Sequence, residues 1–98
     1  DTAGHTAAVD NKKLTTAIVV DIKNIFPKSN IKLIDRILDS NGLVLSENAP
    51  GTPPHRGLFI DRDRLQSGLS EAIFPVETDI KGGTMHTVKF ATDQSKLI

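Results

Sequence analysis

Residues 14–47 read LTTAIVVDIKNIFPKSNIKLIDRILDSNGLVLSE, and this stretch determines the fold class. Leu14–Val20 is rich in β-branched residues and predicts a buried strand. A helical spacing of apolar residues begins after Ser29 or Asn30, either of which could cap the helix, and stops at Asn41-Gly42. A second apolar strand is predicted over Leu43–Glu47. Strand, helix and strand in this order predict a parallel pair with a right-handed crossover.

The same alternation continues on both sides of this stretch. We expect further elements at Asp1–Asn11 (helix), Asp61 or Arg62 to Leu69 (helix), Ala72–Thr78 (strand) and Thr84–Gln94 (helix). The predicted fold is α/β, a Rossmann-like three-layer sandwich with a parallel sheet. The chain opens as if inside a helix and ends as a strand begins, so we expect part of a larger fold, truncated at the first strand.

Composition narrows the function classes. The 98 residues include 12 basic and 12 acidic side chains, and this balance disfavours broad, nonspecific binding to nucleic acid. The absence of cysteine excludes disulfides and thiolate metal sites and is consistent with a cytoplasmic location. No apolar run approaches the roughly 20 residues of a membrane span. We therefore expect no membrane partner, no metal and no cofactor.

The stretch Pro50–Ser70, PGTPPHRGLFIDRDRLQSGLS, carries groups suited to phosphate. Its three arginines, expected in a loop that turns into a helix, are Arg56, Arg62 and Arg64. Guanidinium groups offer planar donor pairs that match phosphate oxygens. The alternative is that these arginines pair locally with Asp61 and Asp63 on a solvated surface, which is common and contributes little energy.

A second phosphate-type feature is Lys81–Thr87, KGGTMHT. Gly82, Gly83 and Thr84 open a predicted helix and could present backbone N–H groups and a hydroxyl to an anion. The alternative is an ordinary turn in which Thr84 is the N-cap. In an open parallel sheet the loops Asp21–Lys28, Asn48–Arg62 and Thr78–Thr84 would lie at one edge, where ligands bind.

These segments together resemble the DNA-processing protein A family (DprA, also called Smf). The resemblance is carried by the proline-glycine loop, Gly-x-Phe, Arg-x-Arg and Gly-Leu-Ser of residues 50–70, by DTAGHTAAVD, by Ile25-Phe26-Pro27 with Asn30, by residues 41–47 and by KGGTMHT. It covers essentially the whole chain, in order. It implies a single DprA-like Rossmann domain over residues 1–98.

The resemblance also implies a function. It predicts a domain that binds single-stranded DNA, forms homodimers and helps to load a RecA-type recombinase in natural transformation. Carried over residue by residue, it gives as ligand- and phosphate-binding residues Arg56, Gly57, Phe59, Arg62, Arg64, Ser67, Gly82, Gly83 and Thr84. The partner would be single-stranded DNA or, as the alternative, a nucleotide or phosphoribosyl ligand.

The chain departs from the family pattern at several positions. Asp63 stands where the family has Asn, and Leu58 and Ile60 replace an Asn and a Pro. The family's first strand and glycine-rich loop are missing. KGGTMHT also lacks the Glu of the related phosphoribohydrolases, so we expect a binding protein and no catalytic residue.

Overall fold

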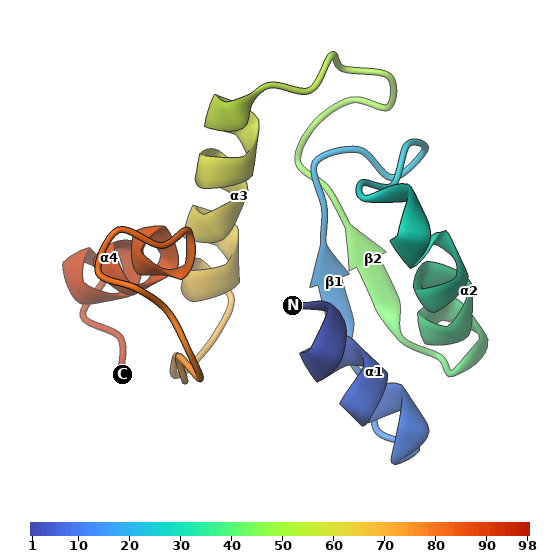
Figure 1. Ribbon diagram of the computed structural model, residues 1–98, viewed down its shortest axis with the longest axis horizontal. Helices are drawn as coiled ribbons and strands as arrows, with labels where there is room; N and C mark the ends of the chain where they lie inside the picture. Colours follow the sequence, from blue (N-terminus) through green and yellow to red (C-terminus); the bar gives the residue numbers. More distant parts are fainter. The chain divides into compact units, whose positions relative to one another are not determined.

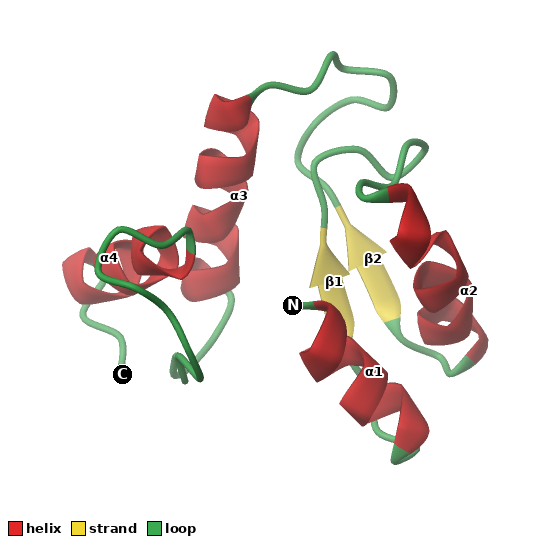
Figure 2. Cartoon of the chain, viewed as in Figure 1, coloured by secondary structure: helices red, strands yellow, loops and turns green.

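The computed structural model describes every residue of the chain, Asp1–Ile98. The chain divides into two compact units, which we treat one at a time: unit 1 is Asp1–Pro54 and unit 2 is His55–Ile98 (Figures 1 and 2). No helix in either unit has the length and apolar character needed to cross a membrane. The expectation of a single domain over residues 1–98 stays a prediction.

Unit 1 contains the predicted strand, helix and strand. Its elements are α1 (Thr2–Asp10), β1 (Thr16–Ile18), the short 3-10 helix η1 (Lys28–Asn30), α2 (Ile31–Asp39) and β2 (Leu43–Leu45). β1 and β2 are parallel, with Ala17 opposite Val44. The ladder extends beyond the strands, because the Val19 amide donates to the Leu45 carbonyl at 2.8 Å. The α/β class with a parallel sheet is therefore confirmed.

The core of unit 1 lies between α2 and the strands. Ile37 of α2 is fully buried, and Ala17, Ile18 and Val20 in and after β1 are buried. This follows from the apolar spacing in α2, which places one face toward the sheet. Figure 1 shows α2 lying along β2.

The predicted helix stop is also confirmed. Asn41 adopts a left-handed φ of 63°, and the Gly42 amide donates to the Ile37 carbonyl at 2.8 Å. A Cβ on Gly42 would lie 2.6 Å from Ile37 Cγ2 and 2.7 Å from the Thr15 carbonyl oxygen. The turn between α2 and β2 therefore has room only for glycine.

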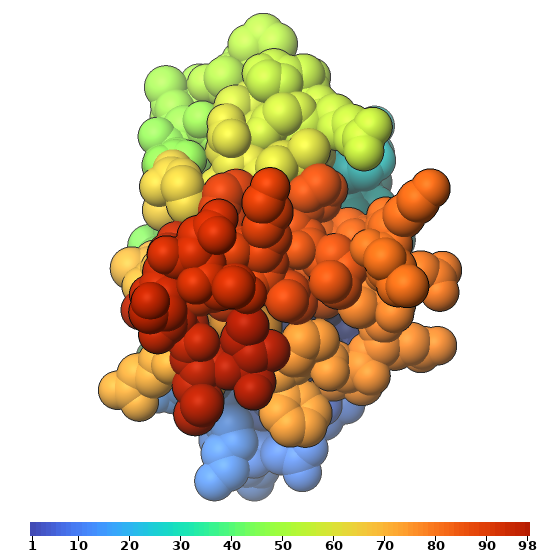
Figure 3. Space-filling view, turned by 90° about the vertical axis from the view of Figure 1, so that its left-hand side faces the viewer, coloured from blue at the N-terminus to red at the C-terminus, as the bar shows by residue number.

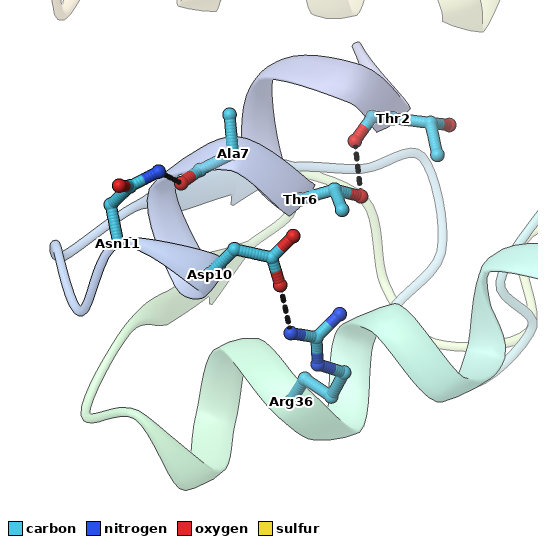
Figure 4. Close-up of polar contacts among 6 residues, drawn as sticks. All are labelled: Thr2, Thr6, Ala7, Asp10, Asn11 and Arg36. Atoms are coloured by element: carbon cyan, nitrogen blue, oxygen red, sulfur yellow. Dashed lines mark hydrogen bonds and ion pairs between the residues drawn. The ribbon is translucent and has the colours of Figure 1, made fainter.

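Polar contacts attach α1 to the rest of unit 1. Asp10 forms an ion pair with Arg36 of α2, and within α1 Thr6 donates to the Thr2 carbonyl (Figure 4). Asn30 occupies the predicted N-cap position of α2 but makes no side-chain cap bond there. Its amide instead donates to Thr2 Oγ1 at 3.0 Å, so this side chain joins the two helices.

Unit 2 is built around two packed helices, α3 (Arg56–Gly68) and α4 (Thr84–Asp93). The predicted start of α3 at Asp61 or Arg62 is wrong. The helix begins directly after His55, which is extended (φ −149°). Pro53 and Pro54 disfavour helix formation, and no proline follows them in α3. All three arginines are therefore helical, and none lies in a loop.

The strand predicted over Ala72–Thr78 is not formed. Only Ala72 pairs, with Leu97, in an isolated parallel bridge, and the Ile73 amide donates to the Leu97 carbonyl at 2.8 Å. Pro75 has no N–H to continue the ladder, and Phe74 is 89% exposed. Figure 3 shows this segment in light orange beside the red end of α4.

Candidate functional site

All the predicted site residues belong to unit 2. Those on α3 are Arg56, Gly57, Phe59, Arg62, Arg64 and Ser67, and those at the start of α4 are Gly82, Gly83 and Thr84. The candidate site is therefore formed by one helix pair. Its relation to the loops of unit 1, expected at the same sheet edge, stays a prediction.

The three arginines differ in their surroundings. Arg56, the first residue of α3, and Arg64 are exposed. Arg62 is half-buried, with a side chain 23% exposed, and its Nε donates to Asp63 Oδ1 at 3.2 Å. Arg62 and Asp63 thus pair locally, as the alternative predicted, but Asp63 is buried and does not lie on a solvated surface. Residues two apart on a helix point in different directions, so Arg62 and Arg64 do not share a face.

Asp63 lies buried on α3. Burial raises the pKa of its carboxyl group, while the positive charge of Arg62, its hydrogen bond and the nearby His86 oppose that rise. The charge pattern alone had suggested an exposed residue. Asp63 and His86 place the middle of α3 and the start of α4 close together.

Ser67 lies inside the helix pair and is fully buried. Its hydroxyl donates to Gln94 Oε1 at 2.5 Å, just beyond the end of α4. One turn along, Thr87 of α4 donates to Gln66 Oε1 at 3.5 Å. These bonds hold α3 against α4, whereas Arg56 and Arg64 are at the surface. A direct contact between Ser67 and a ligand stays a prediction.

Gly57 and Phe59 lie in the first turns of α3, and both are half-buried. A Cβ on Gly57 would come within 3.0 Å of the His55 ring. That spacing is tighter than an ordinary contact, so glycine lets His55 fold back over the start of the helix.

The two glycines before α4 have different roles. The Gly82 amide donates to the Asp79 carbonyl at 2.8 Å, and a Cβ there would collide with the Thr78 hydroxyl. Gly83 occupies the N-cap position without a side-chain cap bond, so Thr84 is not the N-cap. A Cβ on Gly83 would meet nothing within 4 Å. A Cβ would therefore be crowded at Gly82 and unobstructed at Gly83.

Unit 1 has a polar network that the sequence did not reveal. The Asp21 carboxylate accepts hydrogen bonds from the Lys23 amide at 2.9 Å, from Asn24 Nδ2 at 3.0 Å and from the Gly51 amide at 3.0 Å. The bond from Asn24, then that from Lys23, lowers the pKa of Asp21. The loops that follow β1 and β2 therefore meet, as expected, beyond the carboxyl ends of these strands.

The surface of unit 2 can bind an anion through guanidinium groups. Arg56 and Arg64 are exposed, and Arg62 pairs with Asp63. Arg64 follows Arg56 by eight positions, about 12 Å along a helix axis. This arrangement suits a ligand with several phosphates better than one with a single phosphate.

Comparisons with known proteins agree on one family. Residues 1–98 match the family described as DNA recombination-mediator protein A. Protein Smf of Borreliella burgdorferi is 35% identical over 94 residues, covering 95% of this chain and 30% of its own length. The DNA processing protein DprA of Streptococcus pneumoniae is 34% identical over 97 residues, covering 98% of this chain and 34% of its own length.

A solved structure extends this likeness to the fold. The X-ray structure of DNA processing protein A from Streptococcus pneumoniae matches with a TM-score of 0.86 and 32% identity, over 98% of this chain and 34% of that chain. The chain thus spans about a third of the length of these relatives.

Proposed function

Because the chain belongs to the DNA recombination-mediator protein A family, we propose that it binds single-stranded DNA through the arginines of α3. The observation that supports this most directly is the exposure of Arg56 and Arg64 on one helix. Their guanidinium groups can each pair with a phosphate of the DNA backbone. Gly83, which precedes α4, lies in the same unit.

The wider biological role is part of the same proposal. A protein of this family would act in DNA uptake and recombination by helping to load a RecA-type recombinase, and it would form a homodimer. We propose a binding function and no catalysis, since the family's description names a mediator and no reaction. Release of free base from a nucleoside monophosphate would contradict this.

The test is the binding of a fluorescent oligothymidylate of about 20 nucleotides, followed by anisotropy at about 50 mM and higher salt. Arg56→Ala and Arg64→Ala should each weaken binding about three- to tenfold at low salt and reduce the salt slope by about 0.7 per lost phosphate contact. Lys13→Ala removes an exposed charge of unit 1 and is the matched control. Unchanged affinity in both arginine variants would refute the proposal.

A nucleotide or phosphoribosyl ligand is the second candidate. The zero net charge favours it, because a small ligand needs no extended basic surface. A thermal-shift series with nucleoside phosphates and the oligonucleotide separates the two. A nucleotide-specific rise in the melting temperature without oligonucleotide binding would establish the second candidate.

A further inference from the structure

The ion pair between Arg62 and Asp63 lies on α3, the helix proposed above to bind DNA phosphates. Asp63 is only 9% exposed and lies one helical turn before Ser67, so both are on the α3 face that meets α4. Ser67 is bonded to Gln94, and His86 of α4 acts on the Asp63 charge. The position of the Asp63 carboxylate is therefore set by the helix pair.

Arg62 contacts the carboxylate of the residue that follows it on α3. Its Nε donates to Asp63 Oδ1 at 3.2 Å, and the two side chains are 23% and 12% exposed. Charges covered to this degree are screened by salt much less than surface charges. The carboxylate therefore lowers the positive potential around this guanidinium group.

We propose that Asp63 is a positioning residue that sets how much positive charge Arg62 presents to phosphate, so that neutralising Asp63 strengthens anion binding at α3. This inference rests on the function proposed above. Asp61, one residue before Arg62, has the same charge but is exposed. Solvent screens its charge, so neutralising Asp61 has a smaller effect.

Protonation of the Asp63 carboxylate removes its negative charge, as substitution by a neutral residue would. Burial raises the pKa of Asp63, so this carboxyl group takes up a proton at a higher pH than an exposed aspartate. The charged groups that face it are Arg62 on α3 and His86 on α4. Acidification thus releases the charge of Arg62 and raises affinity for phosphate.

Asp63→Asn is the informative variant. The Asn carbonyl still accepts the bond from Arg62 Nε, so the guanidinium group keeps this contact while the negative charge beside it is removed. Oligothymidylate of about 20 nucleotides should bind about three- to tenfold more tightly at low salt. Asp61→Asn, the matched control, should change affinity by less than about twofold.

Two further measurements exclude a merely structural role. In an Arg62→Ala background the gain from Asp63→Asn should vanish, because the charge that it releases is absent. The wild-type chain should bind more tightly as the pH falls through the raised pKa of Asp63, and Asp63→Asn should flatten this profile. His86 acts on the Asp63 charge, so both profiles are repeated with His86→Gln.

The outcomes separate this inference from the proposed function. If Arg64→Ala weakens binding while Asp63→Asn leaves it unchanged, the role of Asp63 is refuted and the DNA-binding function stands. If only Asp63→Asn binds, the inference is supported and Asp63 masks the site in the wild-type chain. If neither chain binds the oligonucleotide, both are refuted. The wild-type pH profile decides the inference if Asp63→Asn proves unfolded by circular dichroism.

Discussion

Unit 1 and unit 2 bury different kinds of side chain. The buried residues of unit 1 are mostly apolar, with Ile37 of α2 packed against the parallel strands. Between α3 and α4 the buried residues are mainly polar, with Ser67, Thr87 and Asp63 set around the single apolar residue Ala91.

This difference has a consequence for the roles of the two units. Apolar burial is nondirectional and supplies most folding free energy, whereas buried polar groups need matched partners and contribute less. Unit 1 therefore supplies the scaffold, while unit 2 holds polar and charged groups at fixed positions. The contrast suggests that substitutions in unit 1 act on stability and those in unit 2 on binding.

The largest expected effect is on the core of unit 1. Ile37→Ala removes a fully buried side chain and should lower the free energy of unfolding by about 2–5 kcal/mol. Leu38→Ala, on the next residue, is the control, since Leu38 is 51% exposed. Urea unfolding followed by far-UV circular dichroism measures both. Equal losses in the two variants would show that α2 has no preferred buried face.

The turn between α2 and β2 should be nearly as sensitive. Gly42→Ala places a Cβ against Ile37 and the Thr15 carbonyl and should cost about 1–3 kcal/mol in the same unfolding assay. Gly4→Ala is the opposite control. No atom lies within 4 Å of that position in α1, so alanine should stabilise the helix by about 0.5–1 kcal/mol. A loss at Gly4 or a gain at Gly42 would contradict the packing described.

In unit 2 the strongest single effect on stability should come from Ser67. Ser67→Ala removes the bond to Gln94 and leaves its carbonyl oxygen without that donor, at a cost of about 1–2 kcal/mol. A double-mutant cycle with Gln94→Ala isolates the pair. A coupling energy near zero would mean that the helix pair does not depend on this polar contact, and the comparison of the units would fail.

The sequence predicted unit 1 better than unit 2 for a physical reason. The apolar spacing in α2 and the stop at Asn41-Gly42 are local signals, and both strands follow from them. Whether residues 72–78 form a strand depends on a partner strand that their own sequence does not specify. In the structure only Ala72 pairs, with Leu97. Strand formation is a nonlocal event, which periodicity cannot test.

The candidate site shows the same limit. The arginines and glycines were predictable as residue types, because phosphate chemistry requires such groups. The early start of α3 was missed because Gly57 and the preceding prolines favour a loop. The burial of Asp63 was missed because it depends on contact with α4, and a lone acid between two arginines has no sequence signal for burial.

The smallest expected effect is a pH dependence of opposite sign in the two units. Hydrogen bonds lower the pKa of Asp21 in unit 1, whereas burial raises the pKa of Asp63 in unit 2. The Asp21 contribution to stability is therefore present above the ordinary aspartate pKa of about 3.9 and is lost as the pH falls through the lowered value. The Asp63 contribution is full below about 3.9 and is lost as the pH rises through the raised value.

Asparagine at either position separates the two contributions. The stability lost in Asp21→Asn should be largest near neutral pH and should shrink in acid, as its bonds from Asn24 and Gly51 weaken in the wild-type chain too. Asp63→Asn should gain relative to the wild type as the pH rises, because asparagine never carries the buried charge. Urea unfolding across the acid range measures both differences. If the stability differences of the two variants change with pH in the same direction, the pKa values of Asp21 and Asp63 are not shifted in opposite directions. The electrostatic contrast between unit 1 and unit 2 would then be refuted.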